Sequence, residues 1–474
     1  MSAAPRLRLL EVQLLERPVR LRMPFRFGVV TLTEAPQVFV RAAIRLEDGR
    51  EAWGAGAELL APKWFDKNLA LTNEQNFDQL RTALRLARDA YLADAAPRTA
   101  FGHFAAHYAA QIEACAARDL NPLVACFGPA QLDRAILDAL CRALAVPFST
   151  AVRRNLAGIA PAAVAPELAG FDMDRFLARL QPARWIAARH TVGLLDAIAG
   201  HPRQADDGLP ESLEEAVAAY GHTWFKLKVG GDVDADVARL AEIAAVLDAA
   251  GRDYRVSLDG NEQYDDLAAL EALIARMRGE PRLARLAASI AFIEQPINRK
   301  HALDTDVGPL AAAAPVIVDE SDATLESFPQ ARALGYAGCS SKMCKGLYKS
   351  IINAARCARW NAEGGRYFMT GEDLTTQAGL AVQQDLALVA LLGMTHLERN
   401  GHHYVNGMAD LPAAEQAVFL AAHPDLYERR HGAVRLAIRD GMLAIGSLDC
   451  PGFASGAMPE WTAMAQSPPP AGES

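Results

Sequence analysis

From about residue 184 the chain alternates between short apolar runs and longer Ala-, Leu- and Arg-rich runs whose apolar residues recur every three or four positions. The short runs are strand-like, and eight of them precede residue 404: 185–193, 223–231, 254–261, 290–296, 315–321, 338–345, 366–372 and 394–400. Eight strands alternating with helices predict a (β/α)8-type barrel, of (β/α)7β form. A doubly wound open sheet is the competing architecture, but no Gly-x-Gly-x-x-Gly follows the first strand.

The residues before the barrel predict a separate α+β domain. Residues 6–58 have the composition of three antiparallel strands, and "EDGR" at 47–50 is a hairpin turn signal. Residues 74–147 have helical periodicity instead. We therefore expect an α+β capping domain over 1–150, a connecting segment over 151–183, and a barrel over 184–404 that carries the active site. We expect the tail, 405–474, to rejoin the first domain through strand-like pieces such as 433–446.

Composition narrows the class of protein. A chain of 474 residues with 51% hydrophobic and 22% charged residues is typical of a folded protein of two domains. The net charge of −9, with no long basic run, argues against a nucleic acid or an anionic membrane as partner. We expect a cytoplasmic protein, because no membrane span or secretory signal is evident. The seven cysteines are scattered, which predicts reduced thiols.

One strand-like run, "TWFKLKVGG" at 223–231, contains two lysines within an otherwise apolar segment. Side chains two positions apart share a face of a strand, so Lys226 and Lys228 point the same way. A buried lysine needs a partner, because removing its charge from water is costly. The simpler interpretation is an edge strand whose lysines face solvent. The residues on the other strands must decide between that and a pair of buried, partnered lysines.

Polar residues close the strand-like runs in order along the chain. They are Lys226 and Lys228, Asp259 and Asn261, Glu294, Asp319 and Glu320, Lys342 and Lys345, Glu372 and Asp373, and Glu398. In a barrel the carboxyl ends of the strands share one rim, so three successive strands each bring a carboxylate to it. Converging carboxylates repel one another unless a cation neutralises them, and oxygen ligands without His or Cys suit Mg2+ better than Zn2+. Lysines on the strands before and after this group place two candidate bases on opposite sides of one metal.

These motifs resemble the enolase superfamily, specifically its muconate-lactonizing-enzyme-like branch within the mandelate racemase/muconate lactonizing enzyme family. The resemblance rests on five barrel motifs in the family's order, "KLKVG" (226–230), "LDGNEQY" (258–264), "FIEQP" (292–296), "VDES" (318–321) and "SSKMCKG" (340–346). In the first domain, "RMPFRFG" (22–28) and "DGREAWGAGAE" (48–58) are similar to the capping domain whose loops close over the substrate. The family's Gly-Glu after the hairpin is here "WGAGAE".

The resemblance implies a role for each matching residue. Asp259, Glu294 and Asp319 would bind Mg2+, with Mn2+ as a substitute, and Asn261, Glu320 and Glu398 would support the site. Lys228 and Lys342 would be the acid/base pair, with Lys345 the weaker choice. Lys226 would lower the pKa of its neighbour Lys228 through like-charge repulsion. Arg26, Phe27 and Lys345 would contact the substrate. His402 and His403 are expected to be loop histidines that could also line the pocket, and Cys344 is expected to pack.

The implied chemistry is removal of the proton next to the carboxylate of a small substrate. The resulting enediolate needs a metal and nearby cations to bind its charge, as is known for enolase-superfamily sites. Racemisation or epimerisation, cycloisomerisation and elimination remain open, although strand eight lacks the Asp-x-Asp of dipeptide epimerases, having "ERN" at 398–400. The alternatives are a metal-independent Schiff-base lyase that uses Lys228 and a non-catalytic barrel that has lost activity. The family resemblance also implies a homo-oligomer.

Overall fold

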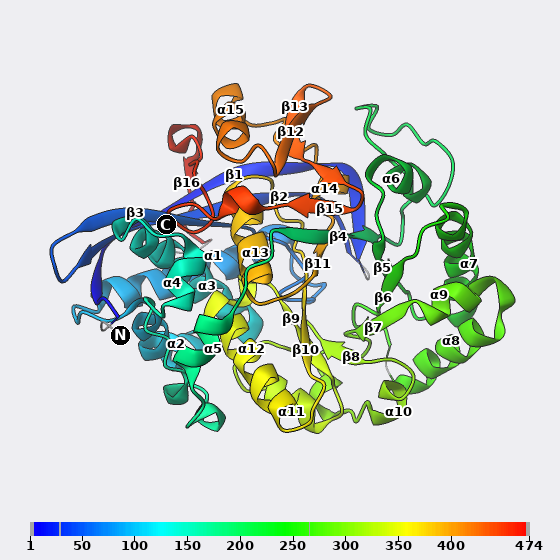
Figure 1. Cartoon of the computed structure of the whole chain (residues 1–474), viewed down its shortest axis with the longest axis horizontal. Coiled ribbons are helices and arrows are strands. Elements are labelled where there is room, and N and C mark those ends of the chain that lie inside the picture. Colours follow the sequence, from blue (N-terminus) through cyan, green and yellow to red (C-terminus); the bar gives the residue numbers. More distant parts are fainter. Residues whose placement is uncertain (1–3, 28–29, 265, 471–474) are drawn as a thin grey trace.

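A computed structural model describes residues 4–27, 30–264 and 266–470 of the chain. It contains a closed barrel, a domain built on an antiparallel sheet, and a C-terminal tail that pairs with both (Figure 1). Within the described residues, no helix combines the length and the apolar character needed to cross a membrane. All seven cysteines are free thiols, and all except Cys450 are buried.

The barrel has eight parallel strands, each paired with the next, and the last pairs with the first. The strands are β4 (Trp185–Val192), β5 (Trp224–Lys228), β6 (Arg255–Asp259), β7 (Ile290–Glu294), β8 (Val316–Val318), β9 (Gly338–Ser341), β10 (Phe368–Gly371) and β11 (His396–Arg399). The helices between them are α6 (Leu213–Tyr220), α7 (Val233–Ala249), α8 (Leu267–Gly279), α9 (Ala284–Ala288), α10 (Gly308–Ala311), α11 (Ser327–Ala333), α12 (Leu347–Ala362) and α13 (Leu380–Leu391). The predicted barrel is confirmed, and each of its strands lies within the run assigned to it.

The first domain is an antiparallel sheet covered by helices, as predicted. Its strands are β1 (Leu7–Phe27), β2 (Val30–Leu46) and β3 (Glu51–Leu59), and its helices are α1 (Asn73–Ala93), α2 (Ala100–Ala116) and α3 (Pro122–Ala143). β3 packs very closely on α3, because a Cβ atom on Gly54 would lie 2.1 Å from the backbone nitrogen of Ala139. Only glycine permits this approach, which explains why the strand reads "WGAGAE".

The first domain and one side of the barrel share a continuous apolar core. A single cluster of buried residues runs from the β1–β2 sheet to α12 and α13 of the barrel. Gln384 on α13 donates a hydrogen bond to the backbone oxygen of Ala55 over 2.7 Å, and Arg22 on β1 lies 2.6 Å from Asp207, before α6. The first domain is therefore held over the rim of the barrel (Figure 1).

A short connecting region links the two units and packs on the barrel. It contains α4 (Phe148–Arg153), α5 (Met173–Arg179) and two 3-10 turns, Pro161–Ala163 and Pro166–Leu168. Arg356 on α12 donates a hydrogen bond to Glu167 over 2.6 Å, which fastens this region to the barrel. The domain boundaries at 150, 183 and 404 remain our proposal.

The tail follows a different path from the predicted one. Its elements are α14 (Gly401–Tyr404), α15 (Ala413–Ala422), β12 (Tyr427–Arg430), β13 (Ala433–Leu436), β14 (Ile438–Arg439), β15 (Met442–Ala444) and β16 (Ala465–Gln466). The run 433–446 was expected on the first domain, but β15 pairs antiparallel with β4 of the barrel. The reason is that β5 pairs with β4 only from Arg189 onward, so the edge at Trp185–Ala187 is available. The tail reaches the first domain later, where β16 pairs with β1.

The start of β11 contains a histidine that the fold keeps neutral. The ring of His396 stacks on Trp224 with centroids 3.9 Å apart. Burial and the nearby Arg189 lower the pKa of His396 to about 2. Because the unfolded value is about 6.5, this contribution to stability is complete above about pH 6.5 and is lost as the pH falls toward the folded pKa.

We therefore expect His396→Phe, which retains the stacking, to make the acid loss of stability less steep. One proton corresponds to about 1.4 kcal/mol per pH unit in the free energy of unfolding. Urea unfolding at about pH 6, 5 and 4 measures the slope for the parent and the variant. His301→Phe, at an exposed position, is the control and should leave the slope unchanged. Equal slopes for the parent and His396→Phe would contradict this prediction.

Candidate active site

The carboxyl ends of the central barrel strands bring the predicted residues together. Lys228 on β5 is directly opposite Asp259 on β6, and Asp259 is directly opposite Glu294 on β7. Asp319 follows β8 and Lys342 follows β9, so both lie at the same rim. This is the convergence expected where parallel strands of a barrel end.

Lys226 lies at the centre of a ring of carboxylates. Its Nζ atom is 2.8 Å from Glu294, 2.9 Å from Asp259, 2.9 Å from Glu372 and 3.0 Å from Glu398. Burial alone would lower the pKa of Lys226, but the carboxylates outweigh it and raise the pKa well above its ordinary value. Lys226 is therefore a permanent ammonium group whose charge is shared among four acids, and its proposed effect on the pKa of Lys228 stays a prediction.

The two candidate acid/base lysines each pair with one aspartate. Lys228 Nζ lies 2.5 Å from Asp259 Oδ2, and Lys342 Nζ lies 2.7 Å from Asp319 Oδ2. Burial alone would raise the pKa of Asp259 and Asp319, but the neighbouring lysines lower both, that of Asp319 well below its usual range. Burial alone would lower the pKa of Lys342, and Asp319 reverses this and raises it. Lys342 is thus an ammonium group for as long as Asp319 has no other cation.

Glu294 has an oxygen atom with no partner. Its Oε1 accepts a hydrogen bond from Lys226, whereas its Oε2 is buried and without a hydrogen bond among the described residues. Burial, with the negative charges of Asp259 and Glu372, raises its pKa well above the ordinary value. Within the part of the chain that the structure describes, Asn261 Oδ1 and Glu320 Oε2 are also buried without hydrogen-bond partners. Buried oxygens without partners destabilise a fold, and an all-oxygen group of this kind fits Mg2+.

Supporting contacts hold these groups in place. Asn261 donates a backbone hydrogen bond to Asp259 over 2.8 Å, and its side-chain amide lies 3.4 Å from Glu320. Thr191 on β4 donates a hydrogen bond to Glu398 over 2.7 Å. Arg189 on β4 donates a hydrogen bond to Glu372. The sequence placed Glu372 at the rim without a role and did not include Arg189, because only the closed barrel brings β4 beside β11 and so within reach of the end of β10.

Lys345 and Arg26 do not line the cavity, although Phe27, the third residue expected to contact the substrate, does. Lys345 donates hydrogen bonds to Ser340 over 2.6 Å and to the backbone oxygen of Asp319 over 3.1 Å, so it supports Asp319 from behind. Arg26 is exposed and alternates with Phe25 and Phe27, which are buried and line the cavity. Neither Lys345 nor Arg26 is among the described residues that line the cavity.

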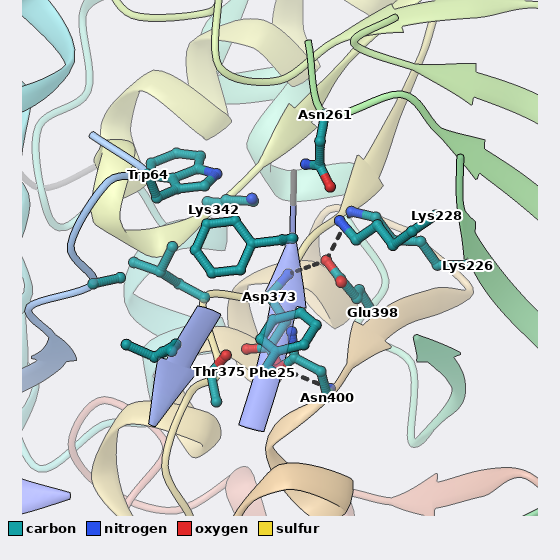
Figure 2. Close-up of a pocket in the computed structure, with 14 residues that line it drawn as sticks. Phe25, Trp64, Lys226, Lys228, Asn261, Lys342, Asp373, Thr375, Glu398 and Asn400 are labelled. Atoms are coloured by element: carbon teal, nitrogen blue, oxygen red, sulfur yellow. Dashed lines mark hydrogen bonds and ion pairs between the residues drawn. The ribbon is translucent and has the colours of Figure 1, made fainter. Parts of the chain in front are cut away.

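The cavity lies between the barrel rim and the first domain. Figure 2 shows Lys228 and Lys342 extending their ammonium ends toward one another across it. The first domain contributes an apolar wall of Phe25, Phe27, Leu32, Ala61 and Trp64, and the barrel contributes Lys226, Lys228, Asn261, Lys342, Asp373, Leu374, Thr375, Glu398 and Asn400. Lys342 Nζ lies 4.2 Å from the centroid of the Trp64 ring. The cavity thus has one charged side and one apolar side.

The loop that carries Trp64 is fastened to the barrel. Lys67 Nζ lies 2.5 Å from Glu262, and Arg299 lies 2.7 Å from the same glutamate. Arg299 also donates a hydrogen bond to the backbone oxygen of Trp64 over 2.8 Å. The predicted residues did not include Trp64, although its place in "PKWFDKN" soon after the hairpin puts an aromatic residue on a loop facing the rim. The ion pairs close this loop over the cavity.

Comparison with protein families agrees with this geometry. Residues 208–453 match the family model described as enolase C-terminal domain-like, which spans the barrel from α6 onward and part of the tail. No curated protein sequence matches the chain.

Several solved structures have the same fold. An enolase from alpha proteobacterium BAL199 with bound Mg is 17% identical and matches over 96% of this chain and 97% of that chain, with a TM-score of 0.58. The 2-chloromuconate cycloisomerase from Rhodococcus opacus 1CP is 16% identical over 95% and 97%, with a TM-score of 0.59. The L-Ala-D/L-Glu epimerase from Bacillus subtilis is 16% identical over 95% and 99%, with a TM-score of 0.57. At these identities the likeness establishes the fold alone.

Proposed function

The chain belongs to the enolase superfamily, in its mandelate racemase/muconate lactonizing enzyme branch, and we propose that it is a Mg2+-dependent isomerase or lyase that removes the proton next to a substrate carboxylate. The observation that carries this proposal is the pair of lysines, Lys228 and Lys342, reaching into one cavity beside three converging carboxylates. Proton removal at carbon needs both a base and nearby positive charge, and this rim supplies both.

Asp259, Glu294 and Asp319 are the proposed ligands of the metal. Their oxygens suit Mg2+, and Mn2+ can substitute because it accepts the same ligand type. When bound, Mg2+ supplies positive charge to the substrate carboxylate as the α-proton leaves. Asn261, Glu320 and Glu398 position these ligands and the lysines through the contacts described above.

Lys228 and Lys342 are the proposed proton carriers. A lysine that lies on one side of the α-carbon removes the proton in its free amine form, and the ammonium group on the other side returns a proton or protonates a leaving group. Lys226 adds a fixed positive charge on the floor of the cavity. This arrangement supports racemisation or epimerisation, cycloisomerisation and elimination alike. The apolar wall that includes Phe27 and Trp64 favours a small carboxylate with an apolar part.

Solvent deuterium exchange tests the proposed function. The protein is incubated in D2O with a panel of small carboxylates, with Mg2+ or with EDTA, and incorporation at the α-carbon is followed by NMR. We expect at least one panel member to exchange with Mg2+ and to stop exchanging with EDTA. Exchange that is equally fast in EDTA would rule out the metal, and no exchange across the panel would rule out the reaction class.

Two glutamates that both contact Lys226 give a matched test of the metal site. Glu294 Oε2 has no hydrogen-bond partner among the described residues. Both oxygens of Glu372 accept hydrogen bonds: Oε1 from Arg189 and Thr370, and Oε2 from Lys226. We expect Glu294→Gln to weaken Mg2+ binding by at least about 10-fold, since even the loss of an outer partner of a ligand costs 10–100-fold. Glu372→Gln should bind Mg2+ within a few-fold of the parent. Calorimetric titration measures both, and equal affinities for the two variants would refute the assignment.

A homo-oligomeric state and a cytoplasmic location remain predictions from the sequence. Sedimentation velocity of the purified protein measures the first directly.

A further inference from the structure

A group of histidines lies on the outer side of the barrel, away from the carboxylate rim. His190 is on β4, His222 comes just before β5, and His402 is on α14. Arg189 and Thr191 point into the barrel, where they contact Glu372 and Glu398, so His190 between them points outward. The histidines come from three segments that meet where β11 and β4 close the barrel.

The ring nitrogens of these three histidines converge. One nitrogen from each of His190, His222 and His402 lies within 4.8 Å of the others. His190 Nδ1 and His402 Nε2 are 3.2 Å apart. Zn–N bonds of about 2.0–2.1 Å in a tetrahedral site place two ligand nitrogens roughly 3.3 Å apart. The spacing of this pair already matches that of two ligands on one metal ion.

The tautomer of His222 leaves a lone pair available. Its Nδ1 donates a hydrogen bond to the backbone oxygen of Ala188 over 3.0 Å, so Nε2 has no proton. His222 is only 2% exposed, and its Nε2 has no hydrogen-bond partner among the described residues. A histidine ligand usually donates its other nitrogen to a backbone oxygen or carboxylate in this way. A buried, unpartnered acceptor is costly, and a bound cation would satisfy it.

Burial changes the protonation of these histidines. Burial lowers the pKa of His222 to about 4, and burial with the other imidazoles lowers the pKa values of His190 and His402 well below the ordinary value. His190 Nδ1 and His402 Nε2 are within hydrogen-bond distance of one another, so one of them carries a proton that a bound metal ion would displace.

A second cavity reaches one member of this group, His402. It is lined by His402 together with Tyr220, Thr376, Gln377 and Arg435. A fourth ligand, such as water or an anion paired with Arg435, would lie on this side of His402. Three protein ligands with an open fourth position is a common zinc arrangement.

We propose that His190, His222 and His402 form a second metal site, which binds a first-row transition metal ion such as Zn2+. Imidazole ligands suit Zn2+ and its neighbours, whereas the carboxylate rim suits Mg2+, so the two sites select different ions. The metal would join β4, the start of β5 and α14 across the closing seam of the barrel. The site is independent of the proposed reaction at the rim.

Cobalt absorption tests the proposal on the whole protein. Metal-free protein is titrated with Co2+ in excess Mg2+, which occupies the carboxylate rim. Four-coordinate cobalt with nitrogen ligands absorbs visible light intensely, whereas octahedral cobalt with oxygen ligands absorbs weakly. We expect the parent to develop the intense bands with one equivalent of Co2+ and to lose them when one equivalent of Zn2+ is added. Their absence from the parent would overturn the proposal.

Variants locate the site. His222→Ala and His402→Ala should each weaken Co2+ binding by more than about 100-fold, because the loss of an outer partner alone costs 10–100-fold. His301→Ala, at an exposed position, should bind as the parent does. Full Co2+ binding by either cluster variant would overturn the assignment. Should a variant fail to fold, Zn2+ must still raise the unfolding temperature of the parent in excess Mg2+, and no such rise would contradict the site.

Discussion

Replacing Lys228 or Lys342 with alanine is expected to lower turnover of a carboxylate substrate by about 10²–10⁴-fold, the usual contribution of a positioned acid or base. Both side chains line the cavity, and each is paired with an aspartate that we assign to the metal. Removing the amine leaves the cavity without a proton carrier on that side. Steady-state kinetics measures the loss, which should fall on kcat more than on KM.

Chemical rescue separates loss of the amine from a change in structure. A small primary amine such as methylamine fits the space left by the lysine side chain, and we expect it to restore part of the turnover of Lys228→Ala. The unfolding temperature of each variant in Mg2+ serves as the control for folding. Turnover within a few-fold of the parent in both variants would show that neither lysine carries the proton.

The second large effect concerns stability. Lys226→Met is expected to destabilise the metal-free protein by about 3–5 kcal/mol, the cost of leaving a buried charge without its partner. Four carboxylates lie within 3.0 Å of Lys226 Nζ, and they would be left without their common cation. Because acids without a cation take up protons, the loss should grow as the pH rises. Urea unfolding in EDTA at two pH values measures it.

Lys228→Met is the matched control, since Lys228 contacts Asp259 alone among these acids. We expect it to cost clearly less than Lys226→Met under the same conditions. If Lys226→Met were as stable as the parent at every pH, the ring of carboxylates would not depend on this lysine.

The barrel was predictable because its signals are local. A strand of four to eight residues, a closing polar side chain and a following helix can all be read within one repeat, as in "LDGN" and "FIEQP". The path of the tail could not be predicted in this way. β15 pairs with an edge of β4 that is available only because β5 begins to pair with β4 at Arg189. No local pattern in residues 433–446 indicates that this edge of β4 is unpaired.

Part of the candidate site could also be predicted from the sequence, and part could not. Residues that close strands, such as Asp259 and Glu294, follow from the rule that barrel chemistry sits at the carboxyl ends. The pairing of Lys226 with Glu372 and Glu398 does not, because only the closed barrel brings side chains of β5 within reach of residues at the ends of β10 and β11, which are far away in sequence. The grouping of the three histidines could not be predicted for a similar reason, because His190 and His222 lie in different repeats from His402.

The stereochemistry of proton exchange tests the central claim most directly, namely that Lys228 and Lys342 act on one α-carbon from opposite sides. Each enantiomer of an accepted carboxylate is incubated in D2O with Mg2+ and with the parent, Lys228→Ala or Lys342→Ala, and α-deuterium is measured by NMR. We predict that each variant loses exchange of a different enantiomer by at least about 100-fold. Variants that both exchange the two enantiomers at the parent rate would contradict the account.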